Sequence, residues 1–197
     1  MTPSPDRFTV VQAGFAHDEP TARAGLDSAD DAVRASSLRA LRRMDALTAH
    51  DVARGLADAS PEVRRTAVEF AHPFDVAIHG LLDDGDVFVA EMAAWALGER
   101  TSASDEEIAA LIRAVESHAE PVVREASAAA LGSIGDERGL PAILRACKDK
   151  PAVRRRAVLA LAPFEGDEVE AALRTALTDK DWQVRQNAEI LLSPRGS

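Results

Sequence analysis

The chain has 197 residues, of which 46% are hydrophobic and 28% charged, a composition typical of a folded globular protein. Its 33 acidic residues outnumber its 23 basic ones, and the net charge of −10 argues against a general affinity for nucleic-acid phosphates. Cys147 is the only cysteine, which excludes an intrachain disulfide and favours a reducing compartment. Because neither a signal-peptide pattern nor an apolar run of roughly 18 residues occurs, we expect a cytoplasmic protein without a membrane partner.

A ten-residue pattern recurs along the chain and opens with valine, followed by arginine in five of its six copies. The copies begin at Val33, Val63, Val89, Val123, Val153 and Val184, and the steps between them are 30, 26, 34, 30 and 31 residues. Periods of this size are typical of solenoids, in which each repeat buries its apolar face against its neighbours. We therefore expect one domain over residues 1–197, with a cap segment in 1–19, repeats in 20–193 and a tail in 194–197.

The cap segment is expected to be a partial repeat that covers the open N-terminal end of the stack, since terminal repeats must hide an exposed core face. Its helix can begin at Ser4, with Pro5 at the first helical position. Three apolar residues would then share one helical face: Phe8, Val11 and Phe15.

Each following repeat is expected to contain a short first helix, a turn and a second helix. The first helices are predicted near 20–28, 48–58, 74–83, 105–117, 139–148 and 167–178, and the second helices near 31–44, 61–71, 87–99, 121–134, 151–162 and 182–192. If the valine is counted as position 1, then positions 1, 5, 8 and 9 lie on one side of the helix. These positions hold only apolar residues apart from Ser37 and Ser127, which predicts the buried face of every second helix.

Helix boundaries have their own signals. Residues that can cap a second helix stand three positions before a valine, at Asp30, Ser60, Asp86 and Asp181. Prolines suited to the first helical position are Pro61, Pro121 and Pro151, and glycines suited to helix exits are Gly98, Gly132 and Gly135. Pro73 is expected to end the second helix of its repeat near Ala71.

The valine–arginine, alanine and alanine–leucine spacing resembles HEAT-like repeats of the short type first described in phycocyanobilin lyases, over about residues 20–193. The resemblance implies an all-α fold: a right-handed α-α superhelix, or HEAT-like solenoid, of about six helix pairs plus an N-terminal partial cap. It also implies that the arginine after each valine pairs with an aspartate of a neighbouring repeat. The arginines are Arg34, Arg64, Arg124, Arg154 and Arg185, the expected partners are Asp58, Asp84 and Asp179, and Ala90 leaves one pair missing.

Residues that would indicate catalysis or metal binding do not form a recognisable motif. Gly132-Ser133-Ile134-Gly135 is expected at a helix exit rather than at a nucleophile elbow, because no strand is predicted. The five histidines are scattered without an i, i+4 ligand pair, so neither a metal nor a cofactor is expected. Cys147 is expected to be a small core residue.

The second helices are expected to line the concave surface, with positions 3, 7 and 10 turned away from the core. The predicted binding face contains Arg39, Arg65, Glu69, Glu91, Trp95, Glu125, Arg155, Leu159, Gln186 and Ile190. Trp95, Leu159 and Ile190 stand where a solvated helix would carry Lys or Glu, and contiguous exposed apolar residues mark interaction sites. The alternative is that these three residues pack between adjacent second helices.

We therefore predict a non-enzymatic scaffold that binds a protein or peptide segment, as a monomer or weak homodimer. The alternative is an enzyme or enzyme-accessory protein, resembling either a chromophore lyase or the alkylpurine DNA glycosylase that has a related HEAT-like fold. Trp95, Glu91 and Glu125 loosely fit a glycosylase site, and basic residues cluster at Arg34/Arg39/Arg42/Arg43 and Arg154/Arg155/Arg156. The net negative charge makes nucleic acid the less favoured partner.

Overall fold

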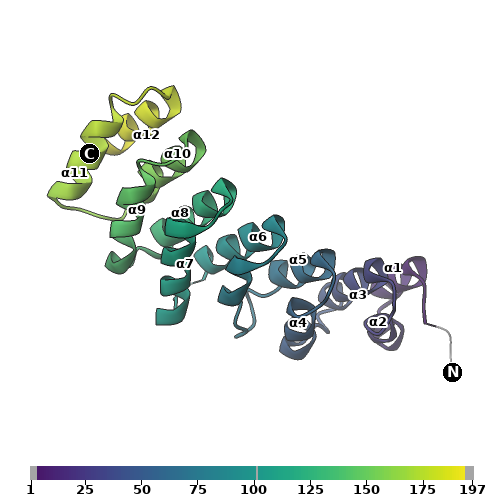
Figure 1. Ribbon diagram of the computed structural model, residues 1–197. Helices are drawn as coiled ribbons and strands as arrows, with labels where there is room; N and C mark the ends of the chain where they lie inside the picture. Colours follow the sequence, from purple (N-terminus) through teal and green to yellow (C-terminus); the bar gives the residue numbers. More distant parts are fainter. Residues whose placement is uncertain (1–3, 101, 194–197) are drawn as a thin grey trace. The chain divides into compact units, whose positions relative to one another are not determined.

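The computed structural model describes residues 4–100 and 102–193, and the predicted tail at 194–197 lies outside these ranges. Within them, all regular secondary structure is helical, with twelve α-helices and two 3-10 helices (Figure 1). The all-α repeat fold predicted from the sequence is confirmed. The chain forms two compact units, Met1–Ile78 and His79–Ser197. Among the described helices, none has the length and apolar character that crossing a membrane requires.

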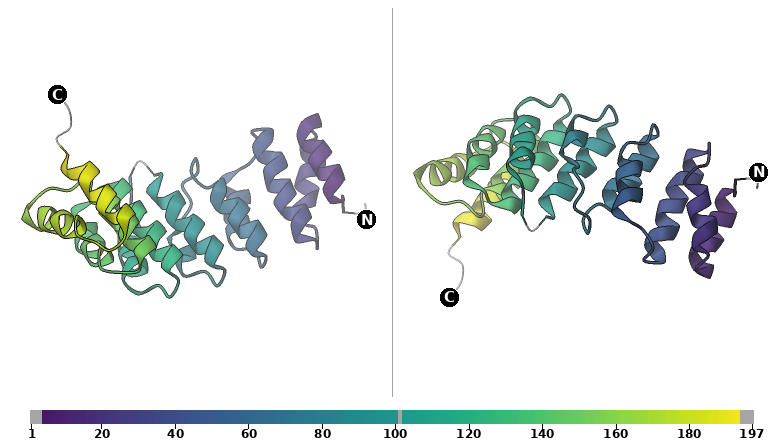
Figure 2. Two further views of the ribbon diagram at one scale, coloured as in Figure 1. Left: turned by 90° about the horizontal axis from the view of Figure 1, so that it is seen from above. Right: turned by 90° about the horizontal axis from the view of Figure 1, so that it is seen from below.

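The first unit contains two helix pairs preceded by a single helix. Its elements are α1 (Arg7–Ala16), α2 (Glu19–Gly25), α3 (Asp31–Arg43), α4 (Ala49–Leu56) and α5 (Pro61–Glu69). Helix α3 packs between α1 and α5, so these three helices form one layer, while α2 and α4 lie in the other layer (Figures 1 and 2). The second helices of the repeats are thus α3 and α5, and α1 lies in the same layer.

The second unit contains four repeats. Its elements are η1 (His79–Asp83), α6 (Val87–Gly98), α7 (Asp105–Ser117), α8 (Pro121–Ile134), η2 (Glu137–Gly139), α9 (Leu140–Ala146), α10 (Pro151–Ala160), α11 (Asp167–Ala176) and α12 (Trp182–Leu192). Helix α8 packs between α6 and α10, and α10 packs on α12, so the second helices form a continuous layer. Helices α7, α9 and α11 make up the opposite layer in Figure 1.

One predicted first helix, near residues 74–83, is mostly wrong. Residues 71–78 contain no helix, and only the short 3-10 helix η1 follows at His79–Asp83. Pro73 cannot donate a backbone hydrogen bond, and Gly80 and Gly85 weaken any longer helix. The preceding helix α5 also ends at Glu69, two residues before the predicted boundary at Ala71.

The N-terminal helix α1 is capped by Asp6 instead of Ser4, because the Asp6 carboxylate accepts the Thr9 backbone N–H at 2.8 Å. It packs on α3 as a cap should, but through Val10, Ala13 and Gly14. The face predicted from Phe8, Val11 and Phe15 instead points outward. The reason is steric, since a Cβ on Gly14 would lie only 3.0 Å from Cα of Ala40. Side chains the size of phenylalanine have no room at this contact.

The same close contact joins α6 to α8 and α8 to α10 in the second unit. A Cβ added to Gly98 of α6 would lie 2.9 Å from Cα of Ala130 in α8, and one added to Gly132 of α8 would lie 2.6 Å from Cα of Ala160 in α10. Gly132 therefore lies inside α8 as a packing residue, which corrects its predicted place at a helix exit. Helix α8 instead ends at Gly135, which is its C-cap residue and has a φ of 70°.

Most of the predicted caps and core positions are confirmed. The side chains of Asp30, Asp86 and Asp181 accept N–H bonds from the first turns of α3, α6 and α12. Ser60 occupies the N-cap position of α5 but makes no capping bond, and its hydroxyl donates to Asp31 at 2.7 Å. Pro61, Pro121 and Pro151 each begin a helix. Residues at positions 1 and 5 are buried in all six second helices.

Two buried serines at position 5 allow a matched stability test. The Ser37 hydroxyl donates to the Val33 carbonyl at 2.9 Å, whereas Ser127 Oγ is buried without a hydrogen-bond partner among the described residues. The other four repeats carry alanine at this position. We expect Ser127→Ala to raise the free energy of unfolding by about 1 kcal/mol and Ser37→Ala to lower it by about 0.5–1 kcal/mol, as measured by urea denaturation. Equal effects of the two substitutions would contradict the difference in hydrogen bonding.

The close helix contact predicts a second matched pair. Gly132→Ala gains helix propensity, but its methyl group meets the backbone of Ala160, so we expect a net loss of about 1–3 kcal/mol in unfolding free energy. Gly80→Ala is the control, because a Cβ there has no atom within 4 Å. Thermal unfolding should show a lower midpoint for Gly132→Ala only. A Gly132→Ala protein as stable as the parent would mean that α8 and α10 can move apart at this contact without loss of stability.

Candidate functional site

Arginines at position 2 of the second helices connect successive repeats. In the first unit, Arg34 donates two bonds to Asp58, both of 2.7 Å. In the second unit, Arg154 donates two bonds to Asp179, of 2.8 and 2.7 Å. Both pairs were predicted. A third, Arg124 with Asp149 at 2.6 and 2.9 Å, was missed because Asp149 stands four residues before the next valine instead of five.

The same arginines also bind the loop that precedes their own helix. Arg34 donates to the carbonyls of Ser28 and Ala29, and Arg124 to those of His118 and Ala119, at 2.7–3.1 Å. Equivalent bonds run from Arg64 to Asp58 and Ala59, from Arg154 to Asp149, and from Arg185 to Asp179. These guanidinium groups therefore hold the loops before the second helices in place.

The repeat that lacks its arginine also lacks the matching aspartate. Ala90 is fully buried at position 2 of α6, and His118 occupies the place of the aspartate five residues before Val123. His118 Nδ1 accepts the Glu120 backbone N–H at 3.1 Å, the same local bond that Asp58 makes with Ser60. Alanine replaces the arginine and histidine replaces the aspartate of the same pair. No aspartate is therefore left without an arginine partner between these two repeats.

The aspartates of the three pairs are acidic beyond their ordinary range. Hydrogen bonds from Arg34, Arg124 and Arg154 lower the pKa values of Asp58, Asp149 and Asp179 below the usual 3.8, and partial burial opposes this shift.

The predicted binding face divides between the two units, and its apolar part lies in the second. Trp95 on α6, Leu159 on α10 and Ile190 on α12 are 48%, 37% and 59% exposed. All three occupy position 7, where α8 carries the half-buried Ala129. We call these four residues the apolar row. Trp95, Leu159 and Ile190 thus each keep more than a third of their surface exposed to solvent.

Trp95 has a charged neighbour that the sequence reasoning did not assign to the site. The Arg156 guanidinium lies 5.8 Å from the centre of the Trp95 ring, within reach of a cation–π interaction. Glu125 on α8 lies 3.7 Å from Arg156 Nε, and Glu91 on α6 is half-buried. Arg156 stands at position 4 of its helix, on the side that faces the preceding second helix. This position in the repeat could have indicated from the sequence that Arg156 belongs to the site.

Arg155, predicted to orient a ligand, is engaged within the fold. It donates two bonds to Asp181, of 3.0 and 2.5 Å, and its carbonyl accepts a bond from the Asn187 side chain at 2.9 Å. Arg155 thus connects α10 to α12. Gln186, the predicted contact in α12, is exposed.

The predicted face is charged in the first unit. Arg39 is exposed at position 7 of α3, donates to the Thr66 hydroxyl at 2.9 Å and lies 3.6 Å from Glu62. Glu69 is exposed at position 7 of α5, and Arg65 is half-buried at position 3. The structure therefore groups the ten predicted residues into three of the first unit and seven of the second.

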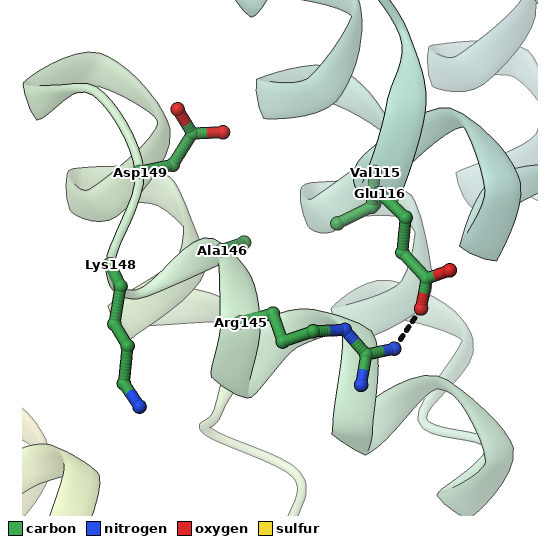
Figure 3. A pocket seen from close by; sticks show the side chains of 6 residues that line it. All are labelled: Val115, Glu116, Arg145, Ala146, Lys148 and Asp149. Atoms are coloured by element: carbon green, nitrogen blue, oxygen red, sulfur yellow. Dashed lines mark hydrogen bonds and ion pairs between the residues drawn. The ribbon is translucent and has the colours of Figure 1, made fainter.

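Two hollows lie in the other layer of the second unit. One, of about 620 Å³, is bordered by Glu116 of α7 and Arg145 of α9, which form an ion pair (Figure 3). The other, of about 340 Å³, is lined by α9 and α11 and includes Cys147. Burial raises the pKa of the Cys147 thiol to about 12, so the thiol stays protonated at neutral pH. Within residues 4–100 and 102–193, no three His, Cys, Asp or Glu side chains are grouped as metal ligands would be.

Comparison with known proteins identifies the repeat. The family model for HEAT repeats matches residues 74–162, and the model for the PBS lyase HEAT-like repeat matches residues 153–179. No curated protein matches the chain.

Solved structures with a similar fold include two designed proteins and an enzyme. The designed armadillo repeat protein YIII(Dq)4CqI is 20% identical, with a TM-score of 0.59 over 88% of this chain and 98% of that one. A second designed armadillo repeat protein, YIII(Dq.V1)4CPAF in complex with peptide (KR)4, is 21% identical, with a TM-score of 0.64 over 89% and 98%. Human deoxyhypusine hydroxylase is 20% identical, with a TM-score of 0.50 over 94% and 76%. At these identities the likeness establishes the fold alone.

The arginine–aspartate pairs predict how stability depends on pH. Because the folded-state pKa values of Asp58, Asp149 and Asp179 are lowered, the pairs stabilise the fold above about pH 4, and this contribution is lost as the pH falls through those lowered values. We expect urea denaturation to show a falling free energy of unfolding from about pH 5 to about pH 2.

The variant Asp179→Asn serves as the comparison for this measurement. It should be less stable at neutral pH, because Arg154 loses its charged partner, and its stability should fall less steeply with acid. An unchanged pH profile in Asp179→Asn would show that this pair does not contribute to the acid response.

Proposed function

Since the chain is a HEAT-like repeat protein, we propose that it is a non-enzymatic scaffold that holds a peptide or protein segment against the second-helix layer of its second unit. The observation that carries the proposal is the apolar row, in which Trp95, Leu159 and Ile190 are exposed at one repeat position. Exposed tryptophan with a nearby arginine is typical anchor chemistry at interfaces, and Arg156 lies beside Trp95.

The spacing of the row suits an extended segment. Packed helices lie about 8–10 Å apart, and an extended chain in the polyproline II conformation advances about 3.1 Å per residue with three residues per turn, so that every third side chain points the same way. One repeat therefore corresponds to about three residues of a segment that crosses the helices. A segment with an apolar side chain at every third residue would place successive side chains over Trp95, Ala129, Leu159 and Ile190.

The charges beside the row favour basic residues in the bound segment. Glu91 and Glu125 lie at position 3 of α6 and α8, while the positive charge of Arg155 at the same position of α10 is paired with Asp181. Glu91 and Glu125 thus place two carboxylates beside the Trp95 end of the row, against the one guanidinium group of Arg156. A designed armadillo repeat protein of similar fold was solved in complex with peptide (KR)4, which supports a solenoid face of this kind as a site for a basic peptide.

The anchor can be tested with one matched pair of substitutions. We expect Trp95→Ala to weaken binding of a labelled peptide with leucine at every third position and lysines between by at least about 30-fold, the effect of losing a hot spot of about 2 kcal/mol. The melting temperature should change little, because Trp95 is half exposed. Fluorescence anisotropy measures the affinity and circular dichroism the melting temperature.

Trp182→Ala is the control, since Trp182 is also exposed but lies at the start of α12, outside the row. It should bind the peptide as the parent protein does. The proposal fails if Trp95→Ala binds the peptide normally, or if it melts many degrees lower, which would make Trp95 a core residue.

A further inference from the structure

Helix α1 stands in the register of a second helix whose first helix is absent from the described residues. Its Gly14 meets Ala40 of α3 in the way that Gly98 meets Ala130 and Gly132 meets Ala160. The groove between α1 and α3 is therefore equivalent to the grooves between the second helices of complete repeats. Its side chains, however, are unlike those of the apolar row.

Three arginines converge on this groove. A hollow of about 130 Å³ is lined by Arg7 and Val11 of α1 and by Ser36, Arg39, Ala40 and Arg43 of α3. In the part of the chain that the structure describes, Arg7 and Arg43 form no ion pair, and Arg39 lies 3.6 Å from Glu62. Like charges brought together in this way repel one another unless an anion joins them. Such a cluster is unexpected in a chain with a net charge of −10.

An apolar rim borders the cluster. Phe8, Val11 and Phe15 are 72%, 39% and 62% exposed along one face of α1. The Arg43 guanidinium lies 4.1 Å from the centre of the Phe15 ring, and this contact holds it beside the groove. The surface thus offers guanidinium groups and apolar side chains side by side.

We propose that the α1–α3 groove is a second docking surface, which binds an acidic segment of a partner protein with aromatic or aliphatic residues among its carboxylates. Guanidinium groups bind carboxylates through paired, charge-assisted hydrogen bonds, and the rim accepts the apolar side chains. Nucleic acid fits less well, because phosphate binding needs basic residues along a longer stripe and here they occupy one short groove. This surface is independent of the apolar row, whose flanking charges favour the opposite kind of segment.

The test uses the full chain and a labelled peptide in which aspartates alternate with phenylalanine and leucine. We expect binding that weakens as salt is added, since the contacts are ionic. The double variant Arg7→Glu/Arg43→Glu should bind at least about tenfold more weakly and with a shallower salt dependence. Arg174→Glu in the second unit changes charge in the same direction at an exposed residue and should bind normally.

Three results would overturn the proposal. The first is equal binding of the parent and the double variant, with circular dichroism showing that both are folded. The second is equal binding of a peptide whose aspartates are replaced by glutamines. The third is absence of peptide binding together with a dimer in sedimentation that Phe8→Asp dissociates, which would make a second copy of the chain the occupant. Trp95→Ala should leave acidic-peptide binding intact. The proposal for the α1–α3 groove can therefore fail or hold independently of the proposal for the apolar row.

Discussion

The contact between glycine and alanine on adjacent second helices is the constraint on which each unit depends. A repeat cannot bury its apolar face alone, so its stability comes from the neighbour it stacks on. In a chain with only 4% aromatic residues, that contact relies on backbones approaching closely rather than on large side chains. At Gly14, Gly98 and Gly132, an added Cβ would lie within 3.0 Å of the Cα of an alanine on the adjacent helix. At these three contacts the two helices therefore pack through their backbones.

Close packing fixes the distance between helices, and the arginine at position 2 fixes the loops at their ends. An exposed ion pair contributes little to stability, because solvent screens it and two long side chains lose freedom. The pairs here differ in that each arginine is largely covered, donates two hydrogen bonds to its aspartate and also donates to a backbone carbonyl of the loop before its own helix. One side chain thus connects two loops of successive repeats. The joint replacement by Ala90 and His118 fits this view, since either change alone would leave a charged group unpaired.

Much of this architecture could be predicted because it depends on local rules. Val-led helices, caps such as Asp86 and Asp181 and prolines at helix starts follow from periodicity and backbone chemistry within a few residues. Prediction failed where the outcome depends on a neighbour. The face of α1 was misassigned because the contact at Ala40 admits only small residues. Arg155 and Arg156 have equal charge and adjacent positions, yet one pairs with Asp181 and the other lies over Trp95, and helix periodicity does not specify where a long side chain ends.

The residues of the proposed apolar row, in contrast, stand at a position that stacking leaves free. Positions 1 and 5 hold valine, alanine or serine in every repeat, and these side chains are buried in all six second helices. Position 7 varies, with Arg39 and Glu69 in the first unit and Trp95, Leu159 and Ile190 in the second. A tryptophan there costs the fold little, and a charge there costs little as well. Each unit can therefore present its own surface chemistry on the same scaffold, basic and aromatic at α1 and α3 in the first unit, and apolar with Glu91 and Glu125 beside its Trp95 end in the second.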